Sequence, residues 1–410
     1  MSGFDTLPHG TKDNIKPFEL HISDQQISDL KQLLKLTPLA PDTYENLQTD
    51  RRFGVSKEWL SNARDYWLTK FDWRKHESHI NSFPSFKADI KDDDGEVYSV
   101  HFAALFSKRK DAVPIAFFHG WPGSFLEFLG MMDVMRNKYK PEDLPYHIVV
   151  PSLVGYTLSS GPPLNKNFTT PDLSRVNDKL MKELGFGDGY VAQGGDVGSG
   201  VTRILAMGHD SCKAAHVNMY MSQLAGGLPL DQMTDIEKEA LARRKTWGET
   251  GTAYANEHGS RPSTIGLALS TNPLALLSWI GEKFLEWTDT DPSLDTILEA
   301  ISLYWFTETF PRCIYPYRER WGSKEYKSKE GEKSGGADRF PAVTKPFGYS
   351  FFPYELLPTP VALVAKTSNL VWHRRHTSGG HFAALEKPKE FAQDIEDFVA
   401  TAWPLTKGSK

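Results

Sequence analysis

A tight turn between a predicted strand and a predicted helix constrains this chain more than any other stretch. Residues 190–192 (YVA) are typical of the end of a buried strand, and residues 197–207 (VGSGVTRILAM) are typical of a helix. The turn between them is GGDVG, residues 194–198. Its glycines allow a sharp strand–turn–helix elbow, the arrangement that in G-x-S-x-G sequences presents a nucleophile at the tip. The residue at the tip here is Asp196.

The identity of the tip residue decides which chemistry is expected. A serine alkoxide attacks acyl carbons, whereas a carboxylate can displace a leaving group from a strained or activated sp3 carbon. The product of that displacement is an alkyl ester of Asp196. A structural role is the alternative, because carboxylates are favoured at helix N-termini and the predicted helix begins at Val197.

Composition limits the kind of protein. The chain has 410 residues, with 47 basic and 52 acidic side chains and a net charge of −5, which gives no electrostatic reason to bind nucleic acid or an anionic membrane. With only two cysteines, no disulfide framework is implied and a reducing compartment fits. The N-terminal sequence lacks the pattern of a signal peptide, and the apolar run at residues 265–280 is broken by STNP, which predicts two helices rather than a membrane span. We therefore expect a cytoplasmic enzyme.

Strand and helix patterns alternate through the first half of the chain. Residues 23–34 and 57–71 predict amphipathic helices, and the first 83 residues otherwise lack strong strand signals. Period-two stretches at residues 85–91 and 96–107, separated by DDDG, predict a hairpin. Further strands are predicted at residues 113–118, 147–151, 190–193 and 214–221, with helices after the first of these and at residues 171–184. This alternation predicts a mostly parallel sheet with helices on both faces.

A helix-rich segment then interrupts the alternation. Helices are predicted at residues 234–245, 274–285 and 294–306, a solvated loop at 324–336, strands at 361–365 and 370–372, and a last helix at 388–403. An α/β sheet with an elbow before a helical insertion is the layout of an α/β-hydrolase with a lid. We expect an N-terminal helical extension packing on the core (1–83), a first core part (84–227), a helical lid (228–339) and a second core part (340–410).

A nucleophile elbow needs a histidine late in the chain, and His381 follows two glycines between the last strand and the last helix. A metal site in HRRHTSGGH, residues 373–381, is disfavoured because that loop has no Cys, Asp or Glu. A partner acid usually follows the penultimate strand, but residues 366–369 contain no carboxylate. Glu355 is the sole acid between Asp338 and His381 and is assigned by elimination, with an ordinary surface glutamate as the alternative.

The turn at residues 119–124 (HGWPGS) follows a strand next to the expected site and opens a helix. Its backbone N–H groups can therefore face a developing oxyanion, and we assign the amides of Trp121 and Val197 to this task. The side chain of His119 is expected only to hold the loop together.

These motifs carry a resemblance. The elbow with aspartate at its tip, HGWPGS, the closing GGHFAALEKP and the segment RPSTIGLALS are similar to those of epoxide hydrolases of the α/β-hydrolase family, in the branch of the microsomal enzyme and its soluble fungal relatives. The resemblance covers nearly the whole chain, including the N-terminal extension, although the membrane anchor of the microsomal members is missing. It implies Asp196 as nucleophile, His381 as base and Glu355 as the acid partner of that base.

The resemblance also implies two lid tyrosines that hold the epoxide oxygen. The first matches Tyr254, and the second matches Tyr317, with Tyr315 two residues away as the alternative. A phenol with a pKa near 10 can donate a hydrogen bond or a proton to the departing alkoxide while remaining neutral at pH 7.

The expected reaction is hydrolysis of a small-molecule epoxide to a vicinal diol, with water as the second substrate. No metal or organic cofactor is required, no nucleic-acid or membrane partner is expected, and a homodimer is left open. One rival is a haloalkane dehalogenase, but that enzyme would be expected to carry an indole donor where this chain has Val197. The other rival is a ligand-binding protein on an inactive hydrolase scaffold, against which the retained Asp196, His381 and Glu355 argue.

Overall fold

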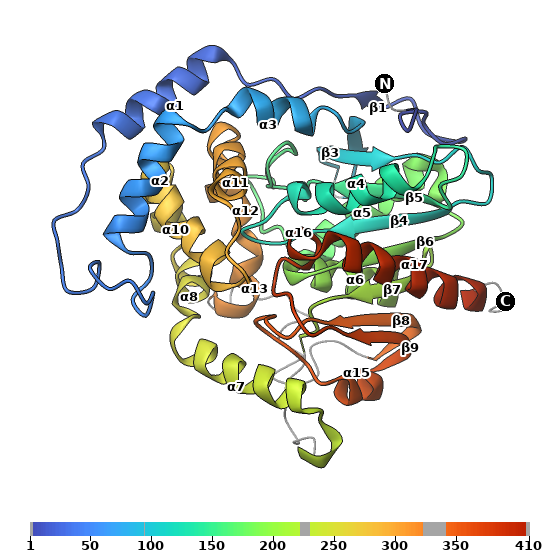
Figure 1. The fold of residues 1–410 in the computed structure, drawn as a ribbon. Helices are drawn as coiled ribbons and strands as arrows, with labels where there is room; N and C mark the ends of the chain where they lie inside the picture. The colour runs from blue at the N-terminus through green and yellow to red at the C-terminus, as the bar shows by residue number, and fades with distance from the viewer. Residues whose placement is uncertain (1–2, 94, 222–229, 323–341, 407–410) are drawn as a thin grey trace.

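A nine-stranded sheet forms the centre of the protein in the computed structural model, which describes residues 3–406 except 94, 222–229 and 323–341 (Figure 1). The strand order is β1-β2-β3-β5-β4-β6-β7-β8-β9. Neighbouring strands are antiparallel from β1 to β5 and parallel from β5 to β9, so the mostly parallel sheet predicted from the sequence is confirmed. The strands are β1 (Ile15–Pro17), β2 (Ser85–Lys91), β3 (Val97–Leu105), β4 (Val113–Phe118), β5 (Tyr146–Pro151), β6 (Tyr190–Gly194), β7 (Cys212–Val217), β8 (Val343–Phe351) and β9 (Ser368–Arg375).

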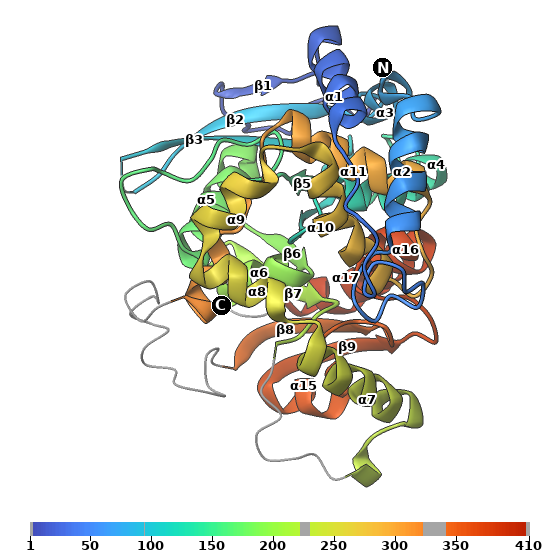
Figure 2. The ribbon, with the colours of Figure 1, turned by 90° about the vertical axis from the view of Figure 1, so that its left-hand side faces the viewer.

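Helices cover both faces of this sheet, as a parallel sheet requires. Figure 2 shows α5 and α6 on one side of the strands and α4, α16 and α17 on the other. The central strands β4 and β5 are buried along their whole length, which explains their unbroken apolar sequences. The covering helices are η1 (Phe125–Phe128), α4 (Leu129–Lys138), α5 (Thr170–Met181), η2 (Lys182–Phe186), α6 (Asp196–Gly208), α15 (Val361–Thr367), α16 (Ala383–Glu386) and α17 (Pro388–Leu405).

The N-terminal segment joins the sheet through β1 and packs its helices on the insertion between β7 and β8 (Figure 1). Its helices are α1 (Asp24–Leu36), α2 (Lys57–Thr69) and α3 (Trp73–Ile80). A capping box at Ser23 fixes the start of α1, the amphipathic helix predicted at residues 23–34. Tyr66 donates a hydrogen bond to Asp295 at 3.1 Å, and Asn272 donates one to Thr37 at 2.6 Å. The N-terminal helices are therefore tied to α10 and α11 as well as to the sheet edge.

The insertion is helical, and we call its described residues 230–322 the lid. Its elements are η3 (Leu230–Gln232), α7 (Asp235–Thr250), α8 (Ala253–Ser260), α9 (Pro262–Leu269), α10 (Pro273–Glu286), α11 (Leu294–Phe306), α12 (Phe310–Cys313), η4 (Tyr315–Tyr317) and α13 (Arg318–Trp321). The broken apolar run predicted from the sequence forms α9 and α10, which meet at a bend of 118°. Within the described ranges, no single helix is long and apolar enough to cross a membrane.

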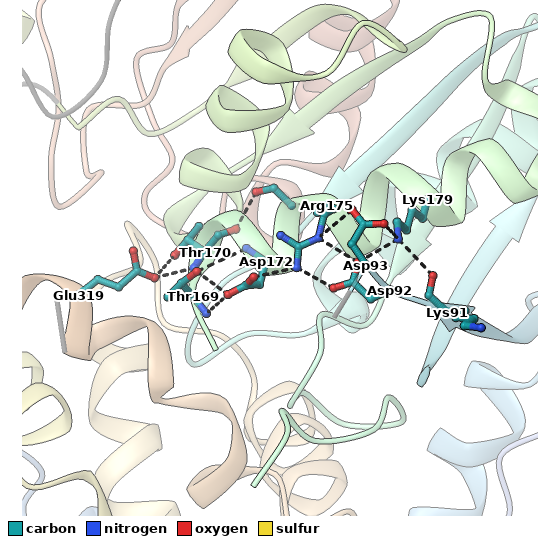
Figure 3. Close-up of polar contacts among 10 residues, drawn as sticks. Lys91, Asp92, Asp93, Thr169, Thr170, Asp172, Arg175, Lys179 and Glu319 are labelled. Carbon is teal, nitrogen blue, oxygen red and sulfur yellow. Dashed lines mark hydrogen bonds and ion pairs between the residues drawn. The ribbon is translucent and has the colours of Figure 1, made fainter. Parts of the chain in front are cut away.

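A chain of polar contacts links the base of the lid to the core (Figure 3). Glu319 of α13 accepts hydrogen bonds from the backbone N–H of Thr170 at 2.6 Å and from its hydroxyl at 2.7 Å. Thr170 is the first residue of α5, and in that helix Arg175 forms ion pairs with Asp172 and with Asp92 of the β2–β3 turn. The N-terminus of α5 is thus where the hairpin, a covering helix and the lid are joined.

In the last third of the chain, one strand prediction is wrong and one strand was not predicted. Residues 361–365 (VALVA) form helix α15 rather than a strand, with Val361 and Val364 buried on one helical face. Short apolar runs do not distinguish a buried strand from a helix, and the true strand, β8, contains Pro346 and Gly348, which concealed it. The register of β8 shifts on the N-terminal side of Pro346, which accommodates that residue.

Other differences are smaller. The first 83 residues contain the strand β1 and the helix α3, neither of which was predicted. The strand β7 ends at Val217 rather than at Met221. The solvated loop predicted at residues 324–336 lies outside the described residues.

Candidate active site

The elbow predicted from the sequence joins β6 to α6 and places Asp196 at the carboxyl end of the parallel strands. Asp196 has φ of 47°, in the left-handed region, where a non-glycine residue costs about 1–3 kcal/mol. Gly198 makes this turn possible, because a Cβ there would overlap the carbonyl group of Phe118 at the end of β4. The close contact between Gly198 and the end of β4 therefore holds Asp196 in this strained position.

The two carboxylate oxygens of Asp196 have different surroundings. Oδ1 accepts a hydrogen bond of 2.8 Å from the backbone N–H of Trp121, in the turn after β4. Oδ2 lies 3.6 Å from Nε2 of His381. Val197 is the second residue of α6, and the N–H groups of the first helical turn have no partner within the helix. Oδ1 therefore faces the predicted oxyanion donor, and Oδ2 faces the predicted base.

His381 is fixed from its other ring nitrogen by Glu355. Nδ1 lies 2.8 Å from Oε1 of Glu355, and both side chains are almost fully buried, with exposed fractions of 2% and 1%. The same oxygen accepts the backbone N–H groups of Leu356 at 2.6 Å and Leu357 at 3.3 Å, which orients the carboxylate. The backbone N–H of His381 donates to the carbonyl oxygen of Trp287 in the lid at 3.0 Å.

Charge governs the protonation of this histidine. Burial alone would lower the pKa of His381, but the charge of Glu355 and the hydrogen bonds to Asp196 and Glu355 outweigh burial and raise that pKa well above its ordinary value. Asp196 is thus one of the two groups that raise the pKa of His381, beside Glu355.

The position of Glu355 along the fold differs from the expectation. The sequence placed Glu355 before a strand at residues 361–365, an unusual position for the acid of such a triad. Because that stretch is the helix α15 and the penultimate strand is β8, Glu355 follows the end of β8 by four residues. The acid thus occupies the usual place, at the carboxyl end of the strand next to the last.

Tyr254 of α8 and Tyr317 of η4 lie on the lid side of the site. The ring of Tyr254 stacks on Trp121 at 5.2 Å, and the ring of Tyr317 meets Trp121 edge to face at 5.9 Å. The two tyrosine rings are 5.7 Å apart, and the phenols are close enough to share a hydrogen bond. Burial and the charge of Asp196 raise the pKa of Tyr254, and burial and the neighbouring Tyr254 raise that of Tyr317, so both are neutral donors.

Tyr315, the alternative second tyrosine, is used elsewhere. Its hydroxyl donates a 3.0 Å hydrogen bond to the carbonyl oxygen of Val154, and its ring packs against Phe168. The geometry therefore favours Tyr317.

Three residues that the sequence did not single out surround these groups. His258 lies one turn after Tyr254, contacts both tyrosine rings and accepts a hydrogen bond from the indole of Trp279 at 3.1 Å. Lys283 is buried with its ammonium 4.9 Å from the ring centre of Tyr254. Glu127 lines a small cavity together with Asp196 and His381. Sequence spacing could have indicated two of them. His258 is four residues after Tyr254 and so lies on the same helical face, and Glu127 is three residues after the cap Ser124, as in a capping box.

Fold and site together define the class of protein. A mostly parallel sheet, an elbow after β6 and a histidine–carboxylate pair on the following loops form an α/β-hydrolase site in which a carboxylate takes the nucleophile's place. The family model "alpha/beta hydrolase fold" matches residues 113–277, and "Epoxide hydrolase N terminus" matches residues 15–128.

Comparison with known proteins narrows the class. The structure of Aspergillus niger epoxide hydrolase is 49% identical over 98% of this chain and 100% of that chain, with a TM-score of 0.89. Epoxide hydrolase 1 of Sus scrofa is 31% identical over 94% of this chain and 89% of its own length. Juvenile hormone epoxide hydrolase from the silkworm Bombyx mori, 24% identical over 96% of each chain, shares the fold with a TM-score of 0.83. The chain belongs to the epoxide hydrolase family, in the branch with the N-terminal epoxide hydrolase segment.

Proposed function

We propose that this enzyme hydrolyses epoxides to vicinal diols through a covalent ester of Asp196. The observation that carries the proposal is that the two oxygens of the Asp196 carboxylate have different partners: Oδ1 accepts a hydrogen bond from the Trp121 amide, and Oδ2 lies beside His381. A carboxylate held in this way can attack with one oxygen and later accommodate negative charge on the other. The two lid tyrosines supply neutral hydrogen-bond donors for the epoxide oxygen.

In the first step, Oδ2 of Asp196 attacks a ring carbon from the side opposite the epoxide oxygen. The carbon–oxygen bond of the strained ring breaks, the phenols of Tyr254 and Tyr317 donate hydrogen bonds to the developing alkoxide, and one phenol passes its proton to that oxygen and becomes a tyrosinate. Because the ester carries no charge, its formation removes one of the groups that raise the pKa of His381, which favours its role as a base in the next step.

In the second step, His381 removes a proton from water, and the water oxygen attacks Cγ of the Asp196 ester. The resulting charge on Oδ1 is stabilised by the amides of Trp121 and Val197. Collapse of the tetrahedral intermediate breaks the bond to the alkyl oxygen, which takes the proton from His381. The second proton of the water remains on the Asp196 carboxyl group and returns through solvent to the tyrosinate, which restores both groups. Glu355 holds the imidazole in the orientation that this exchange requires.

A single turnover in H2(18)O tests the ester. With enzyme in excess over an aryl epoxide such as styrene oxide, the diol should leave with the original Asp196 oxygen and the label should remain in the Asp196 carboxylate. Mass spectrometry of the peptide containing Asp196 and of the diol measures both products. Label in the diol on the first turnover would mean direct attack by water and would refute the ester.

A further inference from the structure

A small cavity lies beside the nucleophile, on the core side of the site. It has a volume of about 10 Å³ and is lined on its polar side by Asp196, His381, Glu127 and Asn218. A cavity of roughly 10–15 Å³ with two to four polar partners can hold one water molecule. The cavity therefore has the size and the chemistry of a site for a single water, next to both the nucleophile and the base.

Glu127 is the one carboxyl group of that lining to which the ester mechanism gives no role. It lies in η1, just after the turn that carries Trp121, and its carboxyl group folds over Gly123 so closely that a Cβ there would overlap it. Burial raises the pKa of Glu127 to about 8; His381 opposes that rise, Asp196 adds to it, and the backbone N–H of Ser124 opposes it as a hydrogen-bond donor. The carboxyl group is thus within electrostatic reach of both reacting side chains.

We propose that Glu127 holds the hydrolytic water in this cavity, between Nε2 of His381 and Cγ of the Asp196 ester. The proposal rests on the ester mechanism and adds a binding site for its second substrate. One hydrogen of the water points to His381 and the other to the Glu127 carboxyl, which leaves an oxygen lone pair for Cγ.

The chemical step then balances as follows. The water oxygen bonds to Cγ, one proton passes to Nε2 of His381, and the charge moves to Oδ1. When the intermediate collapses, the bond between Cγ and the alkyl oxygen breaks, and that oxygen leaves as a diol hydroxyl with the proton from His381. The second proton of the water stays on the Asp196 carboxyl group and returns through solvent to the tyrosinate formed in the first step. Glu127 neither gains nor loses a proton in the step; it orients the water throughout.

A structural role for Glu127 is the competing explanation, because its carboxyl group also accepts the Ser124 N–H at the start of η1. Two substitutions separate the roles. Glu127→Gln keeps a carbonyl acceptor for Ser124 and replaces the other carboxyl oxygen with an NH2 group, whereas Glu127→Leu keeps the bulk of the side chain and removes every polar contact with the water. Glu396→Gln is a matched control, since that carboxylate bonds to Lys138 and Tyr139 and does not line the cavity.

The experiment measures alkylation and ester hydrolysis separately, by rapid quench of styrene oxide turnover and mass spectrometry of the intact enzyme. We expect Glu127→Gln and Glu127→Leu to form the ester at rates within about twofold of wild type. Hydrolysis should slow roughly tenfold in Glu127→Gln and roughly a hundredfold in Glu127→Leu, since the first weakens and the second removes the hydrogen bond that orients the water. Glu396→Gln should change neither rate.

Two outcomes would overturn the inference: hydrolysis at the wild-type rate in both Glu127 variants, or an equal fall of both steps accompanied by a lower melting temperature. Neither outcome touches the ester mechanism, which fails only if no ester forms in the wild-type enzyme and label enters the diol directly. The two proposals are therefore tested independently in the same samples.

Discussion

The core and lid halves of the site are built in different ways. In the core half, Asp196, His381 and Glu355 stand at or just beyond the carboxyl ends of parallel strands, and contacts of 2.8 Å to 3.6 Å fix their polar atoms. In the lid half, Tyr254 and Tyr317 stand on the short helices α8 and η4 and are held by ring contacts 5–6 Å between centres. The backbone of the sheet thus positions the charged side chains, and aromatic packing positions the two tyrosines proposed to bind the epoxide oxygen.

Trp121 is the residue where the two halves meet. Its backbone N–H belongs to the core half and binds Asp196, while its indole contacts both lid tyrosines and Trp287. The two tyrosines therefore pack against the same residue whose backbone N–H is the proposed oxyanion donor. If this division holds, core substitutions should slow ester hydrolysis and lid substitutions should slow ester formation.

The largest effect is expected for His381→Gln. Without a base, ester hydrolysis should fall by about four orders of magnitude, whereas attack by Asp196 needs no base and should continue. The ester should then accumulate and appear as a mass increase equal to that of the epoxide. If the folded His381→Gln protein stays unmodified with a good substrate, His381 is needed for ester formation as well, and the prediction is wrong.

Glu355→Gln should have the next largest effect. The amide can present its NH2 group to Nδ1 and favour the wrong tautomer of His381, and it also removes the charge that steadies the imidazolium. Hydrolysis should slow by about three orders of magnitude, while ester formation, measured in the same rapid-quench experiment, should change far less. Equal slowing of both steps would place Glu355 in a structural role.

The lid tyrosines should give the smallest effect per residue. Tyr254→Phe and Tyr317→Phe should each lower the ester-formation rate by about two orders of magnitude, since one donor to developing charge is lost, and the double variant should be nearly inactive. Tyr315→Phe is the matched control, because its hydroxyl is bonded to Val154, and it should be nearly neutral in rate. Pre-steady-state alkylation rates check this, and a slow Tyr315→Phe beside a normal Tyr317→Phe would exchange their roles.

Local patterns were sufficient for much of the core half. The elbow at Asp196 and the strands β4 and β6 that support it follow from apolar runs and glycine spacing, and His381 follows from its place between the last strand and helix. Glu355 was found by elimination, but its relation to the sheet was wrong. A proline and a glycine hid β8, and the apolar run of α15 resembled a strand, so the acid seemed to precede the strand it follows.

The sequence by itself determined the α/β class and the carboxylate at the elbow, because each depends on patterns among neighbouring residues. The tertiary structure alone decided which tyrosine turns toward Trp121, which oxygen of Asp196 faces His381, and that Glu127 shares a cavity with both. Those relations join segments far apart in the chain. They depend on how the sheet and the lid pack together, and no local pattern of residues records that packing.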